Sequence, residues 1–400
     1  MPTQPTYIDI FAGCGGLSTG LFMAGWHGLF AVEKNVDAFS TLQFNLIDKK
    51  KHFSWPDWLP LESHDINELL SQYKNELCEL RGKITLVAGG PPCQGFSMAG
   101  KRNNNDQRNG LVKSYIKFVE LVQPEVLIFE NVKGFTVEFK QSTETKKYSD
   151  FVVVELEKLG YQVHSEIIDM SEFGVPQSRK RFILVAMKNH SPEKVFEFLE
   201  NHKETFLEAL GLASKTTIED AIGDLEVAHG TVPSPDTRNF SAGIYGEPKS
   251  SYQKLMRKKK DNHSTAVDSH RFVRHTKKVV ELHENLLKDA PAGKRIAPSD
   301  NCVDGLKRRG VTVLDKLSQA PTVTSIPDEM VHYREPRILT VREHARLQSF
   351  PDWFEFKGKY TSGGIRRTQE VPRYTQVGNA VPPLFAEQIG LAMLEVIRDE

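Results

Sequence analysis

The chain has few cysteines, and their arrangement excludes two classes of protein. Only four occur among the 400 residues, at Cys14, Cys78, Cys93 and Cys302. None of them shows the C-x-x-C spacing or the nearby histidine pair of a zinc site, and the pattern does not resemble a disulfide framework. We therefore expect no bound metal and a reducing, cytoplasmic location.

The chain also has no excess of charge of either sign and no long apolar run. Lysine and arginine number 52 together, and so do aspartate and glutamate, so no overall positive field attracts nucleic acid and any such site must be a local patch. The first residues are polar, without a basic and then apolar leader, and no apolar run is long enough to cross a bilayer. We expect a soluble protein with no membrane contact.

The composition is that of an ordinary globular protein, and 400 residues suffice for two domains or for one large domain with an insertion. Apolar strand patterns alternate with helical patterns in residues 1–190, and regular patterns return in residues 331–400. Residues 191–330 have short strands, frequent prolines and glycines, and basic clusters. The sequence predicts an α/β fold with a mixed, mostly parallel sheet, plus a smaller irregular domain at 191–330.

The first predicted strand, residues 7–11, runs into a glycine-rich loop and then a helix that ends near Gly25. Such a turn lets backbone N–H groups approach a ligand closely. Ser18 replaces the third glycine of the dinucleotide fingerprint, so a pyrophosphate is not the obvious ligand. The next strand ends at Glu33, the position from which a carboxylate binds a ribose diol. Together these features favour an adenosine-type cofactor, although a structural turn and a solvated glutamate would give the same pattern.

A second loop carries a candidate nucleophile. Residues 84–88 are apolar enough for a buried strand, and the Gly-Gly-Pro-Pro sequence that follows allows neither strand nor helix to continue. Cys93 is therefore expected just beyond the carboxyl end of a strand, where ligands bind in α/β sheets. The alternative is that Cys93 serves only as a small buried hydrophobic residue.

Residues 98–110 are polar and basic, which is typical of a lid, and Lys101, Arg102 and Arg108 suit phosphate contacts.

Three further positions carry charge where a fold of this kind binds ligands. Glu130 follows an apolar strand at 126–129. Burying a carboxylate there costs desolvation energy, which indicates either a functional role or a partner of opposite charge. Arg179 and Arg181 are two residues apart at the start of a predicted strand, so both guanidiniums can reach one polar ligand. Asp65 opens a helix and suits either an N-cap or a contact with an exocyclic amine.

Basic clusters with aromatic neighbours occur in residues 191–330 and suit a phosphate backbone, although such runs are more often a solvated face. Arg257, Arg271 and Arg274 are the candidates for contacts with bases. Further on, a helix is expected over residues 337–348, and a carboxy-terminal helix follows the Gly-Asn-Ala-Val-Pro-Pro sequence at 378–383.

In order along the chain, these residues resemble the motifs of the DNA cytosine-5 methyltransferases of the bacterial restriction-modification type. Residues 9–18 are similar to the family's cofactor loop, 91–94 to its nucleophile segment, 130–132 to its acid, 177–181 to its paired arginines, 337–351 to the helix that supports the recognition domain, and 378–382 to its closing motif. The resemblance covers about 1–190 and 335–400. The middle segment matches only by position, as the family's variable target-recognition domain.

The resemblance implies a Rossmann-like, S-adenosylmethionine-dependent catalytic domain at 1–190 and 331–400, and a target-recognition domain at 191–330. It implies that Cys93 adds to C6 of a flipped-out cytosine, that Glu130 holds a proton on N3, and that Arg179 and Arg181 lie near O2 and the phosphate. The implied cofactor residues are Phe11, Gly13, Gly15, Leu17, Glu33, Asp65, Ile66, Pro91, Leu111, Asn379 and Val381. Gln94 and Ser97 join the basic residues above as implied DNA contacts, and Cys14, Cys78 and Cys302 are expected to serve packing.

The resemblance implies double-stranded DNA as substrate, a possible cognate restriction endonuclease and a monomer. The nearest alternative is the same chemistry on transfer RNA, which the long, basic middle segment disfavours. A thiol-dependent nicotinamide oxidoreductase would share the strand, glycine loop and acid, but the broken fingerprint and the paired arginines argue against it. In a non-catalytic DNA-binding module we would expect the nucleophile or the acid to be replaced, whereas Cys93 and Glu130 are both present.

Overall fold

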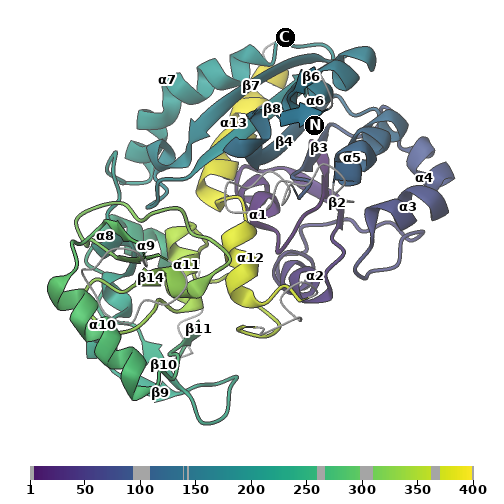
Figure 1. Cartoon of the computed structure of the whole chain (residues 1–400). Helices are drawn as coiled ribbons and strands as arrows, with labels where there is room; N and C mark the ends of the chain where they lie inside the picture. Colours follow the sequence, from purple (N-terminus) through teal and green to yellow (C-terminus); the bar gives the residue numbers. More distant parts are fainter. Residues whose placement is uncertain are drawn as a thin grey trace. The chain divides into compact units, whose positions relative to one another are not determined.

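The computed structural model describes most of the chain (Figure 1), namely residues 4–92, 109–137, 139–141, 144–258, 266–297, 310–361 and 370–398. The chain divides into two compact units. The first unit comprises residues 1–170, 180–203 and 385–400, and the second comprises 171–179 and 204–384. The predicted boundaries at 190 and 331 separate a catalytic domain from a target-recognition domain. The two units are defined by packing alone and do not test these roles, so the predicted domain division stays a prediction.

The first unit is built on a six-stranded sheet with the order β2-β1-β3-β4-β8-β7. Its strands are β1 (Thr6–Ile10), β2 (His27–Val32), β3 (Leu86–Gly89), β4 (Val126–Val132), β7 (Gln162–Asp169) and β8 (Lys180–Met187). The first four are mutually parallel, whereas β8 pairs antiparallel with both β4 and β7. The prediction of an α/β fold with a mixed, mostly parallel sheet is confirmed.

Helices connect these strands. They are α1 (Gly16–Met23), α2 (Val36–Leu42), the π-helix η1 (Gln43–Lys49), α3 (Ile66–Gln72), α4 (Lys74–Glu79), α5 (Asn109–Val122), η2 (Lys133–Thr136) and α6 (Tyr148–Lys158). A short hairpin, β5 (Phe139–Gln141) and β6 (Glu144–Lys146), follows η2. The helices α7 (Glu193–Ala209) and α13 (Pro383–Arg398) contain residues of both units.

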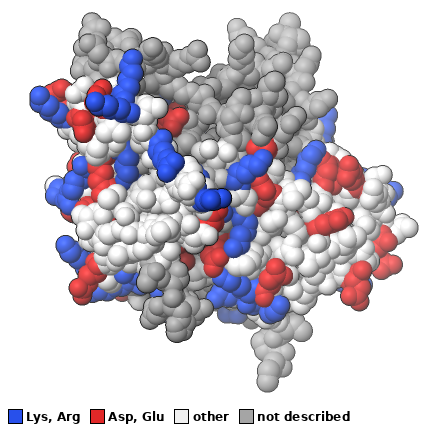
Figure 2. Space-filling model, turned by 90° about the horizontal axis from the view of Figure 1, so that it is seen from below, with Lys and Arg blue, Asp and Glu red and all other residues white. Residues whose placement is uncertain are grey.

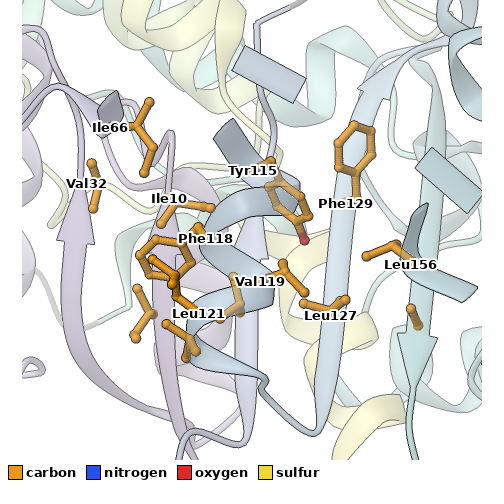
Figure 3. Close-up of a cluster of buried hydrophobic side chains, with 14 of the residues drawn as sticks. Ile10, Val32, Ile66, Tyr115, Phe118, Val119, Leu121, Leu127, Phe129 and Leu156 are labelled. Carbon is orange, nitrogen blue, oxygen red and sulfur yellow. The ribbon is translucent and has the colours of Figure 1, made fainter. Parts of the chain in front are cut away.

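Alternation along the strands gives the sheet two different faces. Ile8 and Ile10 of β1 belong to a buried cluster with Phe118 of α5 and further side chains of α3, α4 and α6, and Figure 3 shows α5 lying over the strands. Tyr7, which directly precedes Ile8, points to the opposite face, where its hydroxyl donates to the Ser18 carbonyl of α1 (3.4 Å). The apolar strands are therefore covered on both faces, as parallel strands require.

The sequence placed most of these elements correctly, with two differences near the site. Glu130 lies inside β4 rather than after it, because β8 pairs with β4 as far as Val132. Gly110, expected to border the lid, is already helical, because α5 begins at Asn109. The rest of the predicted lid lies outside the described residues.

The second unit contains short strands in two small sheets, with the orders β11-β10-β9 and β12-β13-β14. The strands are β9 (Thr231–Pro233), β10 (Ser241–Ile244), β11 (Ala266–Arg271), β12 (Arg295–Ile296), β13 (Val311–Val313) and β14 (Met330–Val331). The helices are α8 (Ile218–Ile222), α9 (Ser251–Arg257), α10 (Lys277–Asp289), α11 (Val341–Leu347) and α12 (Arg373–Asn379), with short 3-10 turns η3 (Met170–Phe173), η4 (Gly223–Leu225), η5 (Val227–His229) and η6 (Pro327–Glu329). The described strands between residues 191 and 330 are short, as the sequence predicted.

The helix expected from residue 337 begins only at Val341. Thr340 caps α11, because its side chain accepts from the Glu343 N–H while the Glu343 carboxylate accepts from the Thr340 N–H. Arg337 lies before this cap and donates two hydrogen bonds, both 2.7 Å, to Glu343. The capping box therefore moves the start of the helix by about one turn.

Buried ion pairs hold α11 in the second unit. Arg342 and Arg346 are fully buried, and Arg346 donates to both oxygens of Asp352 at 2.6 and 2.7 Å. Arg342 pairs with Asp268 at 2.8 Å. Burial opposes ionisation of Asp352, but the neighbouring guanidiniums outweigh it and hold the pKa of this carboxyl below its usual range. Removing one partner would leave an uncompensated buried charge, so these pairs fix the helix.

One helical segment among the described residues, Arg373–Arg398, has the length and hydropathy of a membrane span. It comprises α12 and α13, and 67% of its apolar window is buried inside the protein. Core helices of soluble proteins pass the same test, so the segment is weak evidence for a membrane.

Truncating a core side chain tests the packing of α5. Phe118 is fully buried between α5 and the sheet. Phe118→Ala should lower the free energy of unfolding by about 3–5 kcal/mol, because a cavity adds to the lost transfer energy. Lys117→Ala, at a half-exposed side chain on the same helix, should change it by less than about 0.5 kcal/mol. Urea denaturation measures both, and equal effects would show that α5 does not pack as described.

Candidate active site at the carboxyl edge of the sheet

The loop after β1 has an unusual backbone. Phe11, Gly13 and Gly15 all have positive φ, at 62, 58 and 91°. A Cβ added to Gly13 would meet no atom within 4 Å, whereas one added to Gly15 would press on Leu42 and Leu46. Gly15 is thus needed for close packing, and Gly13 leaves its backbone open toward a ligand. Phe11 adopts a conformation that is costly for a bulky residue, a type of strain that concentrates at functional sites.

Glu33 follows β2 and lies against this loop. Its Oε2 accepts a hydrogen bond from the Gly13 N–H (3.0 Å), and its Oε1 accepts one from the Asn35 N–H (2.7 Å). Burial raises the pKa of Glu33, and the backbone N–H groups counteract this rise. The carboxylate is therefore fixed beside the glycine loop by two hydrogen bonds and is not simply a solvated strand end.

Asp9, which the sequence reasoning did not single out, lies beneath the loop. It is buried in β1, and the Ser18 hydroxyl of α1 donates to its Oδ2 at 2.5 Å. Burial raises the pKa of Asp9 to about 7. The bond ties the strand before the loop to the helix after it. The available signal was a carboxylate inside an otherwise apolar strand.

Asp65 and Ile66 begin α3. Asp65 is its N-cap, since the side chain accepts from the Asn67 N–H at 2.8 Å, and it also pairs with the Lys34 ammonium at 2.8 Å. Partial burial acts to raise the pKa of Asp65, but the hydrogen bonds and the lysine lower it below its usual value. Ile66 is buried in the core. The capping alternative for Asp65 is confirmed, and its contact with a cofactor stays a prediction.

Glu130 borders the segment that leads to Cys93. An added Cβ on Gly90 would lie 3.1 Å from the Glu130 Oε2, so a side chain at this position would press on the carboxylate. The next residue along β4, Asn131, donates from Nδ2 to the Pro91 carbonyl at 3.1 Å. The chain is thus held beside the carboxylate as far as Pro92. Cys93 and the predicted DNA contacts Gln94, Ser97, Lys101, Arg102 and Arg108 lie outside the described residues.

Arg181 is the partner of Glu130. Its Nε lies 3.1 Å from Oε1 of Glu130, and both side chains are only slightly exposed, at 13% and 14%. Burial lowers the pKa of Arg181, and the negative charge of Glu130 counteracts this effect. The structure thus brings the predicted acid together with one of the two predicted arginines.

Arg179 has different surroundings. It precedes β8, so the strand alternation that was expected to align it with Arg181 does not apply to it. Its buried guanidinium belongs to the second unit and donates to three carbonyl oxygens, of Val323 (3.1 Å), Gly378 (3.1 Å) and Ala380 (3.0 Å). These bonds hold the backbone around Asn379. A contact of Arg179 with substrate stays a prediction.

The remaining predicted cofactor residues have mixed exposure. Leu17 of α1 and Val381 are buried, Leu111 of α5 is partly buried, and Asn379 at the end of α12 is exposed. Leu17 and Leu111 belong to the first unit, and Asn379 and Val381 to the second. Their contacts with a cofactor stay predictions.

The three candidate arginines of the middle segment differ from one another. Arg257 at the end of α9 donates to the Asp224 carboxylate and to the Gly246 carbonyl (2.7 Å), so its guanidinium is already engaged. Arg271 lies between two aromatic rings, and Arg274 is exposed. Figure 2 shows both basic and acidic side chains on one face of the molecule.

Two cysteines can be compared with their predicted packing role. Cys14 is buried in the glycine loop, as expected, and burial raises the pKa of its thiol well above the usual value. The prediction is wrong for Cys78, which is exposed on α4 because it follows the one buried residue of that helix, Leu77. Cys302 lies outside the described residues.

Comparisons with known proteins agree on one family. A family model described as C-5 cytosine-specific DNA methylase matches residues 6–395. The Type II methyltransferase M.DdeI of Desulfomicrobium norvegicum is 31% identical over 404 residues, which cover 96% of this chain and 86% of the relative. M.XorII of Xanthomonas oryzae pv. oryzae is also 31% identical, over 99% of this chain and 86% of the relative.

A solved structure shows the same fold. A DNA modification methyltransferase encoded within an E. coli prophage superposes with a TM-score of 0.67 at 23% identity, over 99% of this chain and 100% of that one.

The buried Asp9 gives a prediction for the pH dependence of stability. Because the pKa of Asp9 is about 7 in the folded protein and about 4 in an unfolded chain, only the folded state holds this proton between those values. Its contribution to stability is therefore lost as the pH rises from about 4 to 7. Asp9→Asn keeps an acceptor for Ser18 and removes the titration. Over this range its free energy of unfolding should fall less steeply than that of the wild type.

Urea titrations at several pH values measure this difference. Asp57→Asn, at an exposed position, should keep the wild-type slope. Identical slopes for wild type and Asp9→Asn would contradict the shifted titration.

Proposed function

The chain belongs to the family of C-5 cytosine-specific DNA methylases, and we propose that it methylates C5 of a flipped-out cytosine in a specific sequence of double-stranded DNA, using S-adenosylmethionine. The DNA cytosine-5 methyltransferase activity follows from the family match over nearly the whole chain and from relatives about 30% identical over their length. The observation that carries the finer proposal is the Glu130–Arg181 pair, held beside the backbone that leads to Cys93.

The glycine loop fits the cofactor. The open space at Gly13 and the fixed Glu33 carboxylate beside it match a ligand that carries a ribose diol. Glu33 would bind the ribose and Phe11 would stack near the adenine, with Asp65 at the adenine amine. Gly15, Leu17, Ile66, Pro91, Leu111, Asn379 and Val381 complete the proposed set. When bound, S-adenosylmethionine supplies an electrophilic methyl group.

Cytosine C5 is a poor nucleophile, and the proposed role of Cys93 is to activate it. The Cys93 thiolate forms a bond to C6, while Glu130 holds a proton on N3 and so accommodates the electron density that enters the ring. C5 then has enamine character and would take the methyl group from the sulfonium, whose methyl–sulfur bonding electrons would leave with the thioether product. Transfer of the C5 proton to a base returns the electron pair of the C5–H bond to the ring and breaks the bond between sulfur and C6, which releases the Cys93 thiolate.

Arg181 has two tasks in this proposal. Its bond to Glu130 orients the carboxylate, and its positive charge stabilises negative charge that develops near O2 of the cytosine. The pair is shielded from water, which strengthens both effects. Arg179 acts on the closing segment, because two of its three hydrogen bonds hold the backbone on both sides of Asn379.

The target base must leave the double helix before Cys93 can reach it. Unstacking costs a few kcal/mol, an effect already described for methyltransferases in general, and contacts from the lid and the recognition domain would compensate. Among the predicted DNA contacts, the exposed Arg274 suits a phosphate. Localisation in the bacterial cytoplasm, a monomeric state, the absence of membrane contact and a cognate restriction endonuclease also belong to the proposal.

Transfer RNA is the alternative substrate. Tritium transfer from labelled S-adenosylmethionine distinguishes the two, with label expected in duplex DNA and not in transfer RNA. Label in transfer RNA alone would contradict the proposal. The DNA assignment is supported by the relatives, which are named Type II methyltransferases.

Replacing the nucleophile tests the covalent step. Cys93→Ser should abolish methyl transfer and also trapping by duplex DNA that contains 5-fluorocytosine, because the fluorine blocks release only after a thiol has added. Cys14→Ser should keep both activities, since that thiol is buried in the glycine loop. Gel shift under denaturing conditions and radiolabel transfer measure the two. Methylation by Cys93→Ser would refute the mechanism.

Replacing the acid tests the proton on N3. Glu130→Gln should still bind DNA but should lose about 10²–10⁴-fold in turnover, the usual contribution of general acid catalysis. Glu166→Gln, at an exposed carboxylate of β7, should retain wild-type turnover. Single-turnover rates and DNA-binding titrations separate the two effects. Normal turnover of Glu130→Gln would remove the proposed acid role.

A further inference from the structure

Arg271, at the end of β11, is enclosed by two aromatic rings of the second unit. The carbon at the centre of its guanidinium lies 4.3 Å from the centroid of the Phe240 ring and 3.8 Å from that of Tyr360. Cation–π attraction to both rings fixes the plane of the guanidinium. The side chain is thus held in one orientation before any ligand arrives.

In this sandwich of Phe240, Arg271 and Tyr360, further contacts hold the Tyr360 ring in place. The Tyr360 hydroxyl lies 3.1 and 3.2 Å from the two oxygens of Asp236, and Asp236 also pairs with Arg373 at 2.6 Å. Arg373 in turn lies 4.3 Å from the Tyr360 centroid. The tyrosine ring is therefore held by an ion pair, and the geometry around Arg271 does not depend on Arg271 itself.

Arg271 differs from five other stacked arginines of this unit, because no carboxylate among the described residues forms an ion pair with it. Five others that lie over aromatic rings pair with carboxylates, namely Arg257, Arg334, Arg337, Arg342 and Arg373. Within the described part of the chain, the Arg271 guanidinium meets neither a carboxylate nor a hydrogen-bond acceptor, and its Nε is buried without a partner. The terminal nitrogens Nη1 and Nη2 are not among the buried unpaired atoms. Their N–H groups are available to an external acceptor.

The chemistry of a fixed guanidinium edge favours a base over a phosphate. A planar pair of N–H donors matches O6 and N7 of guanine in the major groove, which is the commonest specific contact of arginine with DNA. A phosphate contact needs positive charge but no fixed plane, and the exposed Arg274, with its guanidinium 5.0 Å from the other ring of the sandwich, Phe240, supplies such a charge nearby.

We propose that Arg271, held between Phe240 and Tyr360, reads a guanine in the recognition sequence through its terminal N–H groups. This inference rests on the proposed function, since it assumes a duplex DNA substrate. It assigns one base pair of that sequence as G·C and names the side chain that selects it.

The test uses the full-length protein and a library of duplexes with randomised base pairs around the target cytosine, sequenced after methylation. The wild type should require guanine at one position. Arg271→Lys keeps the charge but loses the planar fork, so discrimination at that position should fall about 10- to 100-fold while the preference at other positions persists. Arg274→Gln should weaken methylation of all sequences alike. Arg295→Lys, at an exposed ion pair, should match the wild type.

An unchanged sequence profile for Arg271→Lys, a uniform loss over all sequences, or relaxation at an A·T position would each overturn the inference while leaving the proposed function intact. If the wild type methylates no duplex, the proposed function itself fails.

A second pair of variants tests the sandwich without touching the arginine. Phe240→Leu removes one ring and should relax the same guanine position, whereas Phe240→Tyr restores a ring and should restore discrimination. Thermal melting monitors folding of each variant. Wild-type discrimination by folded Phe240→Leu would contradict the proposed role of the rings.

Discussion

The site depends on the pairing of β1 between β2 and β3. Because these three strands are parallel and in register, with Ile10 opposite both Val32 and Gly89, their carboxyl ends meet at one edge of the sheet. The glycine loop, Glu33 and the segment leading to Cys93 all begin within a few residues of that edge. A shift of the strand register by one residue would turn Ile8 and Ile10 away from the core. The hydrophobic burial that stabilises the sheet therefore also fixes the positions of the residues at its carboxyl edge.

The interiors of the two units differ in the kind of side chain that they bury. In the first, a large apolar cluster covers the sheet, and a buried hydrogen bond between Asp9 and Ser18 lies under the glycine loop. In the second, buried arginines and carboxylates replace much of the apolar core, and α11 is buried along its whole length with four such pairs nearby. Burial opposes ionisation of Glu343, yet Arg337 holds the pKa of this carboxyl well below its usual value. A surface built on such a network presents side chains in fixed positions.

Sequence patterns predicted the first unit well because its strands are apolar and its turns contain glycine or proline. The strand end at Val32 followed from residue type alone, and the predicted end at Ala88 differs by one residue from the observed end at Gly89. The pattern could not show that Glu130 pairs with Arg181 across two strands, or that Arg179 binds backbone carbonyls, because those facts depend on register and on the exact start of β8. The start of α11 was missed because a local capping box at Thr340 overrides the apolar periodicity around it.

The second unit was the hardest to predict, since its elements are short and its arginines look alike in sequence. Arg257 and Arg271 both lie in basic runs beside aromatic residues, yet among the described residues Arg257 forms an ion pair with a carboxylate and Arg271 forms none. Only the fold distinguishes them.

The central claim is that Cys93, Glu130 and Arg181 together activate a cytosine ring carbon. Mass spectrometry of nucleosides from duplex DNA treated with the protein and isotopically labelled S-adenosylmethionine tests it most directly, because only attack through a ring carbon requires a thiol. The account predicts that all transferred label is found in 5-methylcytosine. Label in N4-methylcytosine or N6-methyladenine, where an exocyclic nitrogen attacks without any thiol, would contradict it.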